Sequence, residues 1–104
     1  MLATFFEWRI HEGKEQQFRD GWDAVTRMLH QDGSYGSSLF TNAAGHYCAF
    51  AIWPDKQTRD RAFAPYLEKP TDQHLLVREA IAEEIQRMDL DCVNDLWRLP
   101  NSQA

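Results

Sequence analysis

Apolar and polar residues alternate along the first ten positions of the chain. Between residues 2 and 10 the even-numbered positions are apolar except for Thr4, whereas the odd-numbered positions mix apolar residues with Glu7 and Arg9. A two-residue period rich in aromatic side chains is typical of a β-strand. The pattern therefore predicts a strand over residues 2–10 that has one buried face and one amphipathic face.

A helical period follows this strand. Phe18, Trp22, Val25 and Leu29 recur at intervals of four, three and four residues, which places them on one narrow stripe of a helix. Gln31, Asp32 and Gly33 then form a stop signal, because glycine readily adopts the left-handed conformation after a last helical turn. We expect this helix to end before Gly33 and to direct its stripe toward the core.

The middle of the chain predicts a hairpin and a second helix. Two runs with β-strand character, residues 35–42 and 46–53, flank a short connection that ends in Gly45. A connection of this length with a glycine is typical of a β-hairpin. Pro54 ends the second run, and Asp55 is suited to cap a helix over about residues 55–67. The inward side of that helix is expected to carry Ala62, Phe63 and Tyr66.

The last third of the chain predicts another helical piece and a final strand. Thr71 or Asp72 is suited to cap a helix that continues to about residue 87. One face of this predicted helix would carry Val77, Ile81, Ile85 and Met88. The final strand is expected to begin near Asp89, and its alternation breaks at Asn94, where we expect a bulge or the end of a short strand.

This order of elements predicts the ferredoxin-like βαββαβ arrangement of α+β proteins, with a four-stranded antiparallel sheet and both helical segments on one face. The other face of the sheet would then remain uncovered and half apolar. We expect a second copy of the chain to cover it, because closed two-fold dimers are the commonest assembly. Glu7 and Arg9 would lie at that contact or form ordinary polar edges.

Composition limits the remaining possibilities. The 104 residues suit a single domain, here residues 1–99, followed by a flexible tail at 100–104. No apolar run approaches the roughly 20 residues that cross a bilayer, and no signal peptide is recognisable, so we expect no membrane contact and a cytoplasmic protein. The two cysteines, Cys48 and Cys92, are expected to be reduced and to act as small buried apolar residues. The sequence has no CxxC motif and no cluster of cysteine and histidine residues, so we expect no metal site.

Nucleic-acid binding is a competing interpretation, because RNA-recognition motifs share this order of elements. Residues 46–53 (HYCAFAIW) lack the basic residue, the glycine and the first stacking ring of the RNA-binding signature. The formal net charge of −5 also provides no overall basic surface for phosphates. We therefore expect no nucleic-acid partner.

Several short motifs, in their order and spacing, resemble the antibiotic biosynthesis monooxygenase superfamily of dimeric α/β-barrel proteins. The resemblance covers about residues 4–98. Its motifs are residues 12–15 (GlyLys within EGKE), Phe18 with Trp22, the glycine-rich passage 33–37, and Ile52-Trp53 followed by residues 55–57. The resemblance implies that two sheets pack together as a dimeric α/β barrel. It also implies a ligand cavity between sheet and helices in each subunit.

Members of this superfamily carry out several kinds of chemistry. Some oxidise polyphenolic aromatics with O₂ and no cofactor, some degrade haem, and others isomerise or cyclise small molecules. The haem-degrading branch uses an Asn on the first strand, where this chain has Phe6 or Glu7, and only His74 matches its other motif residues. We therefore expect cofactor-independent oxidation of a small aromatic or polyphenolic ligand. The alternative is a non-catalytic ligand-binding or stress-response protein of the same fold.

His74 and Tyr66 are the candidate catalytic residues. Taking 100° per residue, His74 lies within roughly 60° of the apolar face of its predicted helix. A neutral imidazole there could take a phenol or enol proton near pH 7; the alternative is a first-turn residue that bonds to solvent or to the preceding loop. The Tyr66 hydroxyl could orient a ligand. On the same predicted helix, Glu84 is expected to lie roughly 15 Å from His74, too far to pair with it.

Three aromatic residues are the candidate substrate-binding walls. Phe18, Trp22 and Phe63 could enclose an aromatic ligand, or they could be ordinary core residues, since aromatic stripes at helical spacing bury surface. Gly21 beside this stripe costs roughly 1 kcal/mol relative to alanine in a helix. A glycine at this position indicates a close approach by the sheet, a partner or a ligand.

Overall fold

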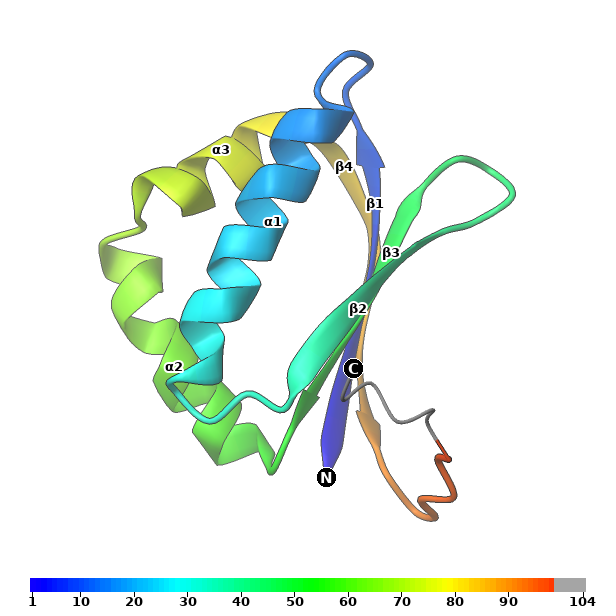
Figure 1. The fold of residues 1–104 in the computed structure, drawn as a ribbon, viewed down its shortest axis with the longest axis vertical. Coiled ribbons are helices and arrows are strands. Elements are labelled where there is room, and N and C mark those ends of the chain that lie inside the picture. The colour runs from blue at the N-terminus through cyan, green and yellow to red at the C-terminus, as the bar shows by residue number, and fades with distance from the viewer. Residues whose placement is uncertain (99–104) are drawn as a thin grey trace, which may run out of the picture.

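The computed structural model describes residues 1–98, which form an antiparallel sheet covered on one face by helices (Figure 1). The strands are β1 (Leu2–Ile10), β2 (Gly36–Thr41), β3 (Tyr47–Trp53) and β4 (Ile81–Asp91); the helices are α1 (Glu15–His30), α2 (Lys56–Glu68) and α3 (Asp72–Ala80). The strand order β2-β3-β1-β4 places β1 and β3 in the centre of the sheet. The predicted ferredoxin-like fold is confirmed. The end of the predicted domain at residue 99 and the predicted tail at 100–104 lie outside the described residues.

The first three quarters of the chain follow the predicted elements closely. Gly33 ends the turn after α1 with φ +101°, a conformation that favours glycine. The side chain of Asp55 caps α2 by accepting a hydrogen bond from the Thr58 N–H at 2.7 Å, and Thr71 caps α3. These local signals identify the boundaries because each satisfies a backbone group that the end of a helix leaves without a partner.

The predicted helix up to residue 87 is wrong. Helix α3 ends at Ala80, and β4 begins at the next residue and ends at Asp91, so Asn94 lies beyond it. The register with β1 shifts twice, between Glu7 and Trp8 and between Arg9 and Ile10. Each shift inserts one extra residue into β4, so its residues 81, 84 and 87 share the inner face at intervals of three. This spacing resembles a helical period, and the sequence here is rich in helix-forming alanine and glutamate.

The core is divided into two clusters at opposite ends of the sheet. In the first cluster the ring of Phe18 packs between Trp8 and Tyr47, with ring centroids 5.3 Å from each. The second cluster joins Leu2, the fully buried Trp53 and helix α2. Leu2 and Trp8 are six residues apart on β1, which corresponds to about 20 Å of strand. The helices are therefore supported at two separate places.

A buried arginine fixes α2 to the sheet beside the second cluster. The guanidinium of Arg59 donates hydrogen bonds to Thr4 Oγ1 at 2.8 Å and to both carboxylate oxygens of Asp89. Asp89 in turn has its pKa lowered, first by the hydrogen bond from Arg59. Since β1 and β4 contribute Thr4 and Asp89, this network ties α2 to two strands at once.

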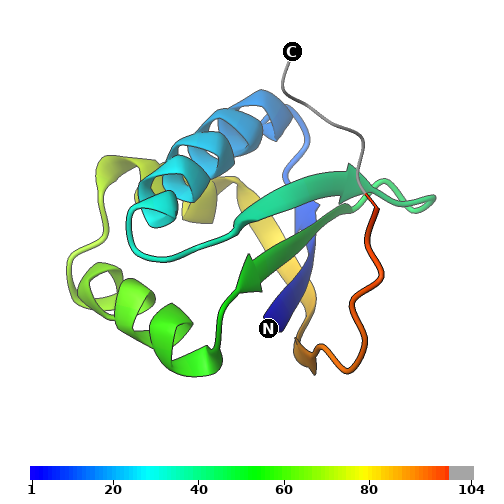
Figure 2. The same cartoon turned by 60° about the horizontal axis from the view of Figure 1, so that its bottom comes forward.

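No helix covers the other face of the sheet, along which the described segment after β4 passes (Figures 1 and 2). This face carries a group of apolar side chains that we call the outer face: Phe5, Phe40, Phe50, Met88 and Leu90. Four of these are exposed by 39 to 54%. Exposed apolar patches of this kind mark contact surfaces.

Polar groups at one end of the outer face are paired within the chain. Glu7 accepts hydrogen bonds from His46 at 2.7 Å, Gln86 at 2.7 Å and Asn42 at 3.0 Å. These bonds, the one with His46 above all, lower the pKa of Glu7. Arg9 pairs with Glu83 at 3.4 Å. Cys48 beside Glu7 is buried, as expected, whereas Cys92 is exposed, and both thiols are free.

Gly21 permits α1 and α3 to pack closely. A Cβ atom at position 21 would lie 2.7 Å from Val77 Cγ2 and 3.3 Å from the Gln73 carbonyl oxygen. The close approach that the glycine indicates is therefore with helix α3.

We expect Gly21→Ala to lower the free energy of unfolding, by about 1–2 kcal/mol, because overpacking outweighs the gain in helix propensity. Chemical denaturation of Gly21→Ala, Val77→Ala and the double variant measures this. In the Val77→Ala background, which removes the blocking methyl groups, Gly21→Ala should cost much less. An equal cost in both backgrounds would contradict the packing explanation.

Candidate functional site

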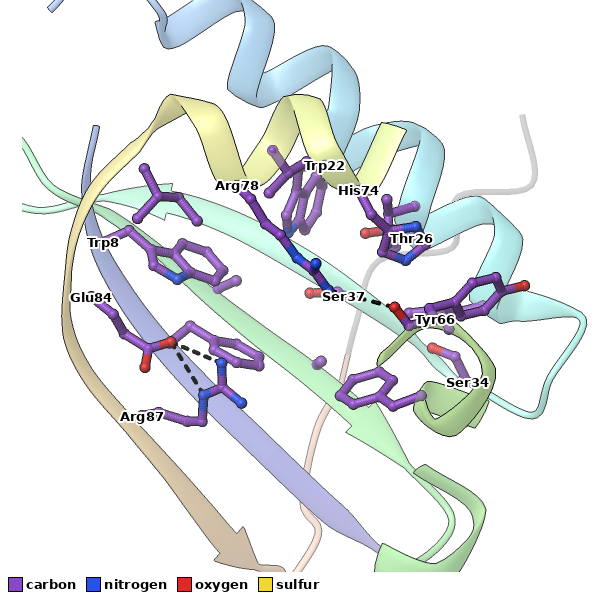
Figure 3. Close-up of a pocket in the computed structure, with 18 of the residues that line it drawn as sticks. Trp8, Trp22, Thr26, Ser34, Ser37, Tyr66, His74, Arg78, Glu84 and Arg87 are labelled. Carbon is purple, nitrogen blue, oxygen red and sulfur yellow. Dashed lines mark hydrogen bonds and ion pairs between the residues drawn. The ribbon is translucent and has the colours of Figure 1, made fainter. Parts of the chain in front are cut away.

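A cavity of about 430 Å³ lies between the inner face of the sheet and the helices. All four strands and all three helices of the described chain contribute to its wall (Figure 3). The two core clusters bound it at either end, and its size falls in the range of small-molecule sites. The cavity therefore has room for an aromatic ligand of two or three fused rings.

The wall is mostly apolar and aromatic. On the sheet side the rings of Phe6 and Trp8 stack with centroids 5.0 Å apart, and on the helix side lie Trp22 and Phe63. Strand β3 contributes only small side chains, Ala49 and Ala51, to the middle of the wall. Flat rings around a space left by alanines suit a flat ligand.

Four of the five predicted site residues come together around this cavity. Trp22, Phe63, Tyr66 and His74 line it. Phe18 does not: its side chain has no exposed surface and belongs to the first core cluster. Phe18 therefore supports the wall from behind.

His74 is held by the first turn of its own helix. Its Nδ1 lies 2.7 Å from Thr71 Oγ1 and accepts a hydrogen bond from the Thr71 N–H at 3.3 Å. A backbone N–H can only donate, so Nδ1 acts as the acceptor, and the neutral ring carries its proton on Nε2. His74 thus bonds to the preceding loop, as the alternative interpretation has it, and it also lines the cavity.

Burial and charge favour the neutral form of His74. Burial lowers the pKa of His74, and the positive charge of Arg78 one helical turn away lowers it further. At pH 7 the imidazole is therefore neutral and offers an N–H donor from Nε2. In this arrangement the ring stabilises negative charge on a ligand oxygen more readily than it removes a proton.

Tyr66 contacts His74 through the face of its ring. The two rings stack with centroids 4.6 Å apart and planes inclined by 23°. In Figure 3 the Tyr66 hydroxyl is directed away from the middle of the cavity. The geometry supports a role in positioning His74 instead of a hydroxyl contact with a ligand.

Three charged residues line the wall although the sequence patterns predicted no such role for them: Arg78, Glu84 and Arg87. Arg78 reaches toward the backbone carbonyl of Tyr66, at 3.5 Å. Arg87 donates two hydrogen bonds to Glu84, at 3.2 and 2.9 Å, and lies over the Phe6 ring. The predicted helix up to residue 87 put Glu84 far from His74. In the structure Glu84 belongs to strand β4, which runs back along the sheet, and both residues line the same cavity (Figure 3).

Two buried polar atoms of wall residues have no hydrogen-bond partner within residues 1–98. They are Ser37 Oγ on β2 and Trp53 Nε1 on β3. An unsatisfied buried donor costs about 1–3 kcal/mol, so such groups need an explanation. Both atoms are closed off from the cavity itself, and Trp53 as a whole has no exposed surface, so a ligand would reach them only after a local rearrangement.

Two other kinds of feature, a metal site and a membrane span, were considered for the described part of the chain. Residues 1–98 contain no group of three or more His, Cys, Asp or Glu side chains that could hold a metal ion. No helix in this range is long and apolar enough to cross a membrane.

We expect the pKa of His74, followed by NMR titration of its ring protons, to lie below the ordinary histidine value. Arg78→Gln should raise this pKa because it removes a neighbouring positive charge. The matched control is Arg61→Gln, on the exposed side of α2, which should leave it unchanged. A pKa that does not respond to Arg78→Gln would contradict the electrostatic explanation.

Comparison with solved structures places the fold among known proteins, although no protein-family profile and no curated protein matches the sequence. A Bordetella bronchiseptica protein provisionally named an antibiotic biosynthesis monooxygenase has a TM-score of 0.72 and 19% identity, covering 89% of this chain and 97% of that chain. SnoaB, a cofactor-independent oxygenase from Streptomyces nogalater, has a TM-score of 0.73 and 14% identity, covering 91% and 95%. A Deinococcus radiodurans protein with the same provisional name has a TM-score of 0.73 and 10% identity, covering 96% and 100%. At the level of the fold, these structures confirm the resemblance to antibiotic biosynthesis monooxygenases.

Proposed function

We propose that this protein is a cofactor-independent monooxygenase that oxidises a small aromatic or polyphenolic compound. The observation that carries the proposal is the aromatic-walled cavity of about 430 Å³, which contains a neutral histidine N–H donor. The fold is shared with SnoaB, which is named a cofactor-independent oxygenase, and this likeness supports the same reaction class.

In the proposed mechanism the protein binds the ligand between its aromatic rings and excludes water. The Nε2–H of His74 and the charge of Arg78 stabilise the ligand as a phenolate or enolate anion. The ligand releases its proton to solvent as it binds. The electron-rich carbon of the anion then bonds to O₂, and the resulting peroxide takes up a proton and loses water to leave a carbonyl group, so the ligand itself supplies the electrons that reduce O₂. Orientation and desolvation are the main contributions of the protein. Tyr66 keeps the imidazole in place by stacking on it.

The test is O₂ uptake with a panel of hydroquinones and polyhydroxylated naphthalenes. We expect His74→Ala to reduce kcat by about 10²-fold, the usual cost of losing one donor to a developing anion. His74→Gln, which retains an N–H donor, should recover part of this loss, whereas a general base would not be rescued. Tyr66→Phe should remain close to wild type because the hydroxyl is directed away from the cavity.

Two outcomes would contradict this proposal. Unchanged turnover in His74→Ala would remove His74 from the reaction. A wild-type protein that binds these compounds but consumes no O₂ would favour the alternative, a non-catalytic ligand-binding or stress-response protein that uses the same cavity.

We also propose that two copies of the chain pack through the outer face. Phe5 and Phe50 lie with ring centroids 4.9 Å apart at the centre of this face, and Phe40 lies 6.3 Å from Phe50. The helices cover only the opposite face of the sheet (Figure 2). Covering these rings with the same surface of a second chain would remove them from water in one closed contact.

Light scattering coupled to size-exclusion chromatography should give the mass of two chains. We expect Phe50→Lys to shift the protein to the monomer, because it places a charge at the centre of the contact. Leu75→Lys, at a comparably exposed position on α3, is the matched control and should remain a dimer. A monomeric wild type, or a dimer that tolerates Phe50→Lys, would rule out this interface.

A further inference from the structure

We propose that residues 92–98, which we call the arm, pack along the edge of strand β2 in a second copy of the chain. This contact rests on the pairing of two copies proposed above and deepens it, because it assigns a partner surface to a segment that the outer face leaves unexplained. It does not depend on the reaction in the cavity.

The arm follows β4 and exposes much apolar surface. Val93, Leu96 and Trp97 are exposed by 96, 82 and 80%, against 39 to 54% for the four exposed residues of the outer face. A tryptophan side chain alone buries roughly 150–250 Å² when it is covered. Large apolar side chains gathered in so short a segment mark a contact surface.

The arm is joined to the rest of its own chain by a single hydrogen bond within residues 1–98. The Cys92 N–H donates this bond to the Met1 carbonyl oxygen, at 3.0 Å. The Trp97 N–H bonds within the arm, to Asp95 Oδ1 at 3.2 Å. In Figure 2 the arm, drawn in orange and red, passes along the face of the sheet that no helix covers, where a second copy would pack.

Strand β2 offers the arm a row of unpaired backbone groups. It is an outermost strand of the described sheet, and it pairs there with β3 alone. Asn42 N–H donates to the His46 carbonyl oxygen at 3.0 Å, and antiparallel ladder bonds alternate along a strand, so residues 38 and 40 also bond toward β3. The N–H groups that are turned away from β3, which we call the edge amides, belong to Ser37, Leu39 and Thr41. An edge of this kind is a template for pairing with another chain.

A groove of about 760 Å³ lies beside this edge, between β2 and α1. Trp22, Phe40 and Tyr47 give it apolar surface that suits the side chains of the arm. Arg19 of α1 also lines the groove, and it forms no ion pair in the described part of the chain, because the ion pair within α1 joins Arg27 to Asp23. The arm carries the opposite charge in Asp95. Its backbone, apolar side chains and charge therefore all match this groove.

Two-fold symmetry brings the arm and the groove together. Because β2 and β4 are the two outer strands, an axis parallel to the strands places the β4 edge of each copy opposite the β2 edge of the other. The arm begins where β4 ends. Its seven residues span up to about 23–25 Å when extended, whereas packed sheets lie about 10 Å apart. The arm is thus long enough to reach the edge of the second copy.

The area of the contact also favours an arm. A stable interface buries about 800 Å² of each partner. The residues of the outer face are already about half covered by their own chain, so they supply only part of this area. The more exposed side chains of the arm supply apolar area that the sheet contact lacks.

The experiment follows hydrogen exchange of single backbone amides by NMR in the full chain, with light scattering to give the mass. In the wild-type dimer we expect the edge amides to be protected. The double variant Leu96→Ser/Trp97→Ser should accelerate their exchange about tenfold or more, because it removes the apolar contacts of the arm. The amide of Ser38, which bonds to β3, should stay protected and shows that the sheet is intact. Leu67→Ser, at a residue of α2 exposed by 73%, is the matched control and should leave the edge amides protected.

A second variant separates the arm of the partner from the arm of the same chain. Phe50→Lys, which is expected to be a monomer, should lose the protection of the edge amides although its own arm is unchanged. Protection that persists in this monomer would overturn the contact between copies, because the chain would then cover its own edge.

The remaining outcomes distinguish the arm from the dimer. Edge amides that exchange freely in a wild-type dimer, or that stay protected in the double variant, would overturn the arm contact and leave the packing of the outer faces standing. Equal acceleration in Leu67→Ser would also overturn it, since the effect would not be specific to the arm. A monomeric wild type would overturn both the arm contact and the proposed dimer.

Discussion

The separation of the core into two clusters is the constraint on which the rest of the molecule depends. Trp8, Phe18 and Tyr47 fill one end of the space beneath the helices, and Leu2 and Trp53 fill the other. Protein interiors are normally packed without large voids. Large rings at both ends hold the helices away from the sheet, and the alanines of β3 leave the middle open. A cavity thus persists in a small domain.

The polar groups around this cavity are arranged by elements that have their own structural reasons for being there. The primary structural role of His74 is in the capping box of α3, where its ring accepts a hydrogen bond from the Thr71 N–H. This bond determines which ring nitrogen carries the proton. Arg87 is paired with Glu84, whereas Arg78 is the cation whose charge lowers the pKa of His74. Local folding therefore determines the chemistry that the wall offers, and that chemistry consists mainly of hydrogen-bond donors.

Sequence patterns identified most of the fold and half of the site. The strand at 2–10, the first helix, the hairpin and both cap residues were predictable because each depends on neighbouring residues. The end of α3 was not, since two bulges gave β4 a three-residue spacing and its composition favours a helix. Because residues 81–87 were predicted as helix, Glu84 and Arg87 were not recognised as residues of the cavity wall. Ser37 and Trp53 could not be singled out either, because a missing partner is visible only in three dimensions.

The direct junction of α3 and β4 limits which insertions and deletions the fold can accept. Ile81 follows Ala80 directly, so the helix and the strand share one continuous backbone. Deleting or adding a residue at this junction would exchange the inner and outer faces of the adjoining strand. New ligand preferences can then arise there only through replacement of side chains. Changes in length are easier to accommodate in connections such as residues 69–71, whose backbone does not set the register of the sheet.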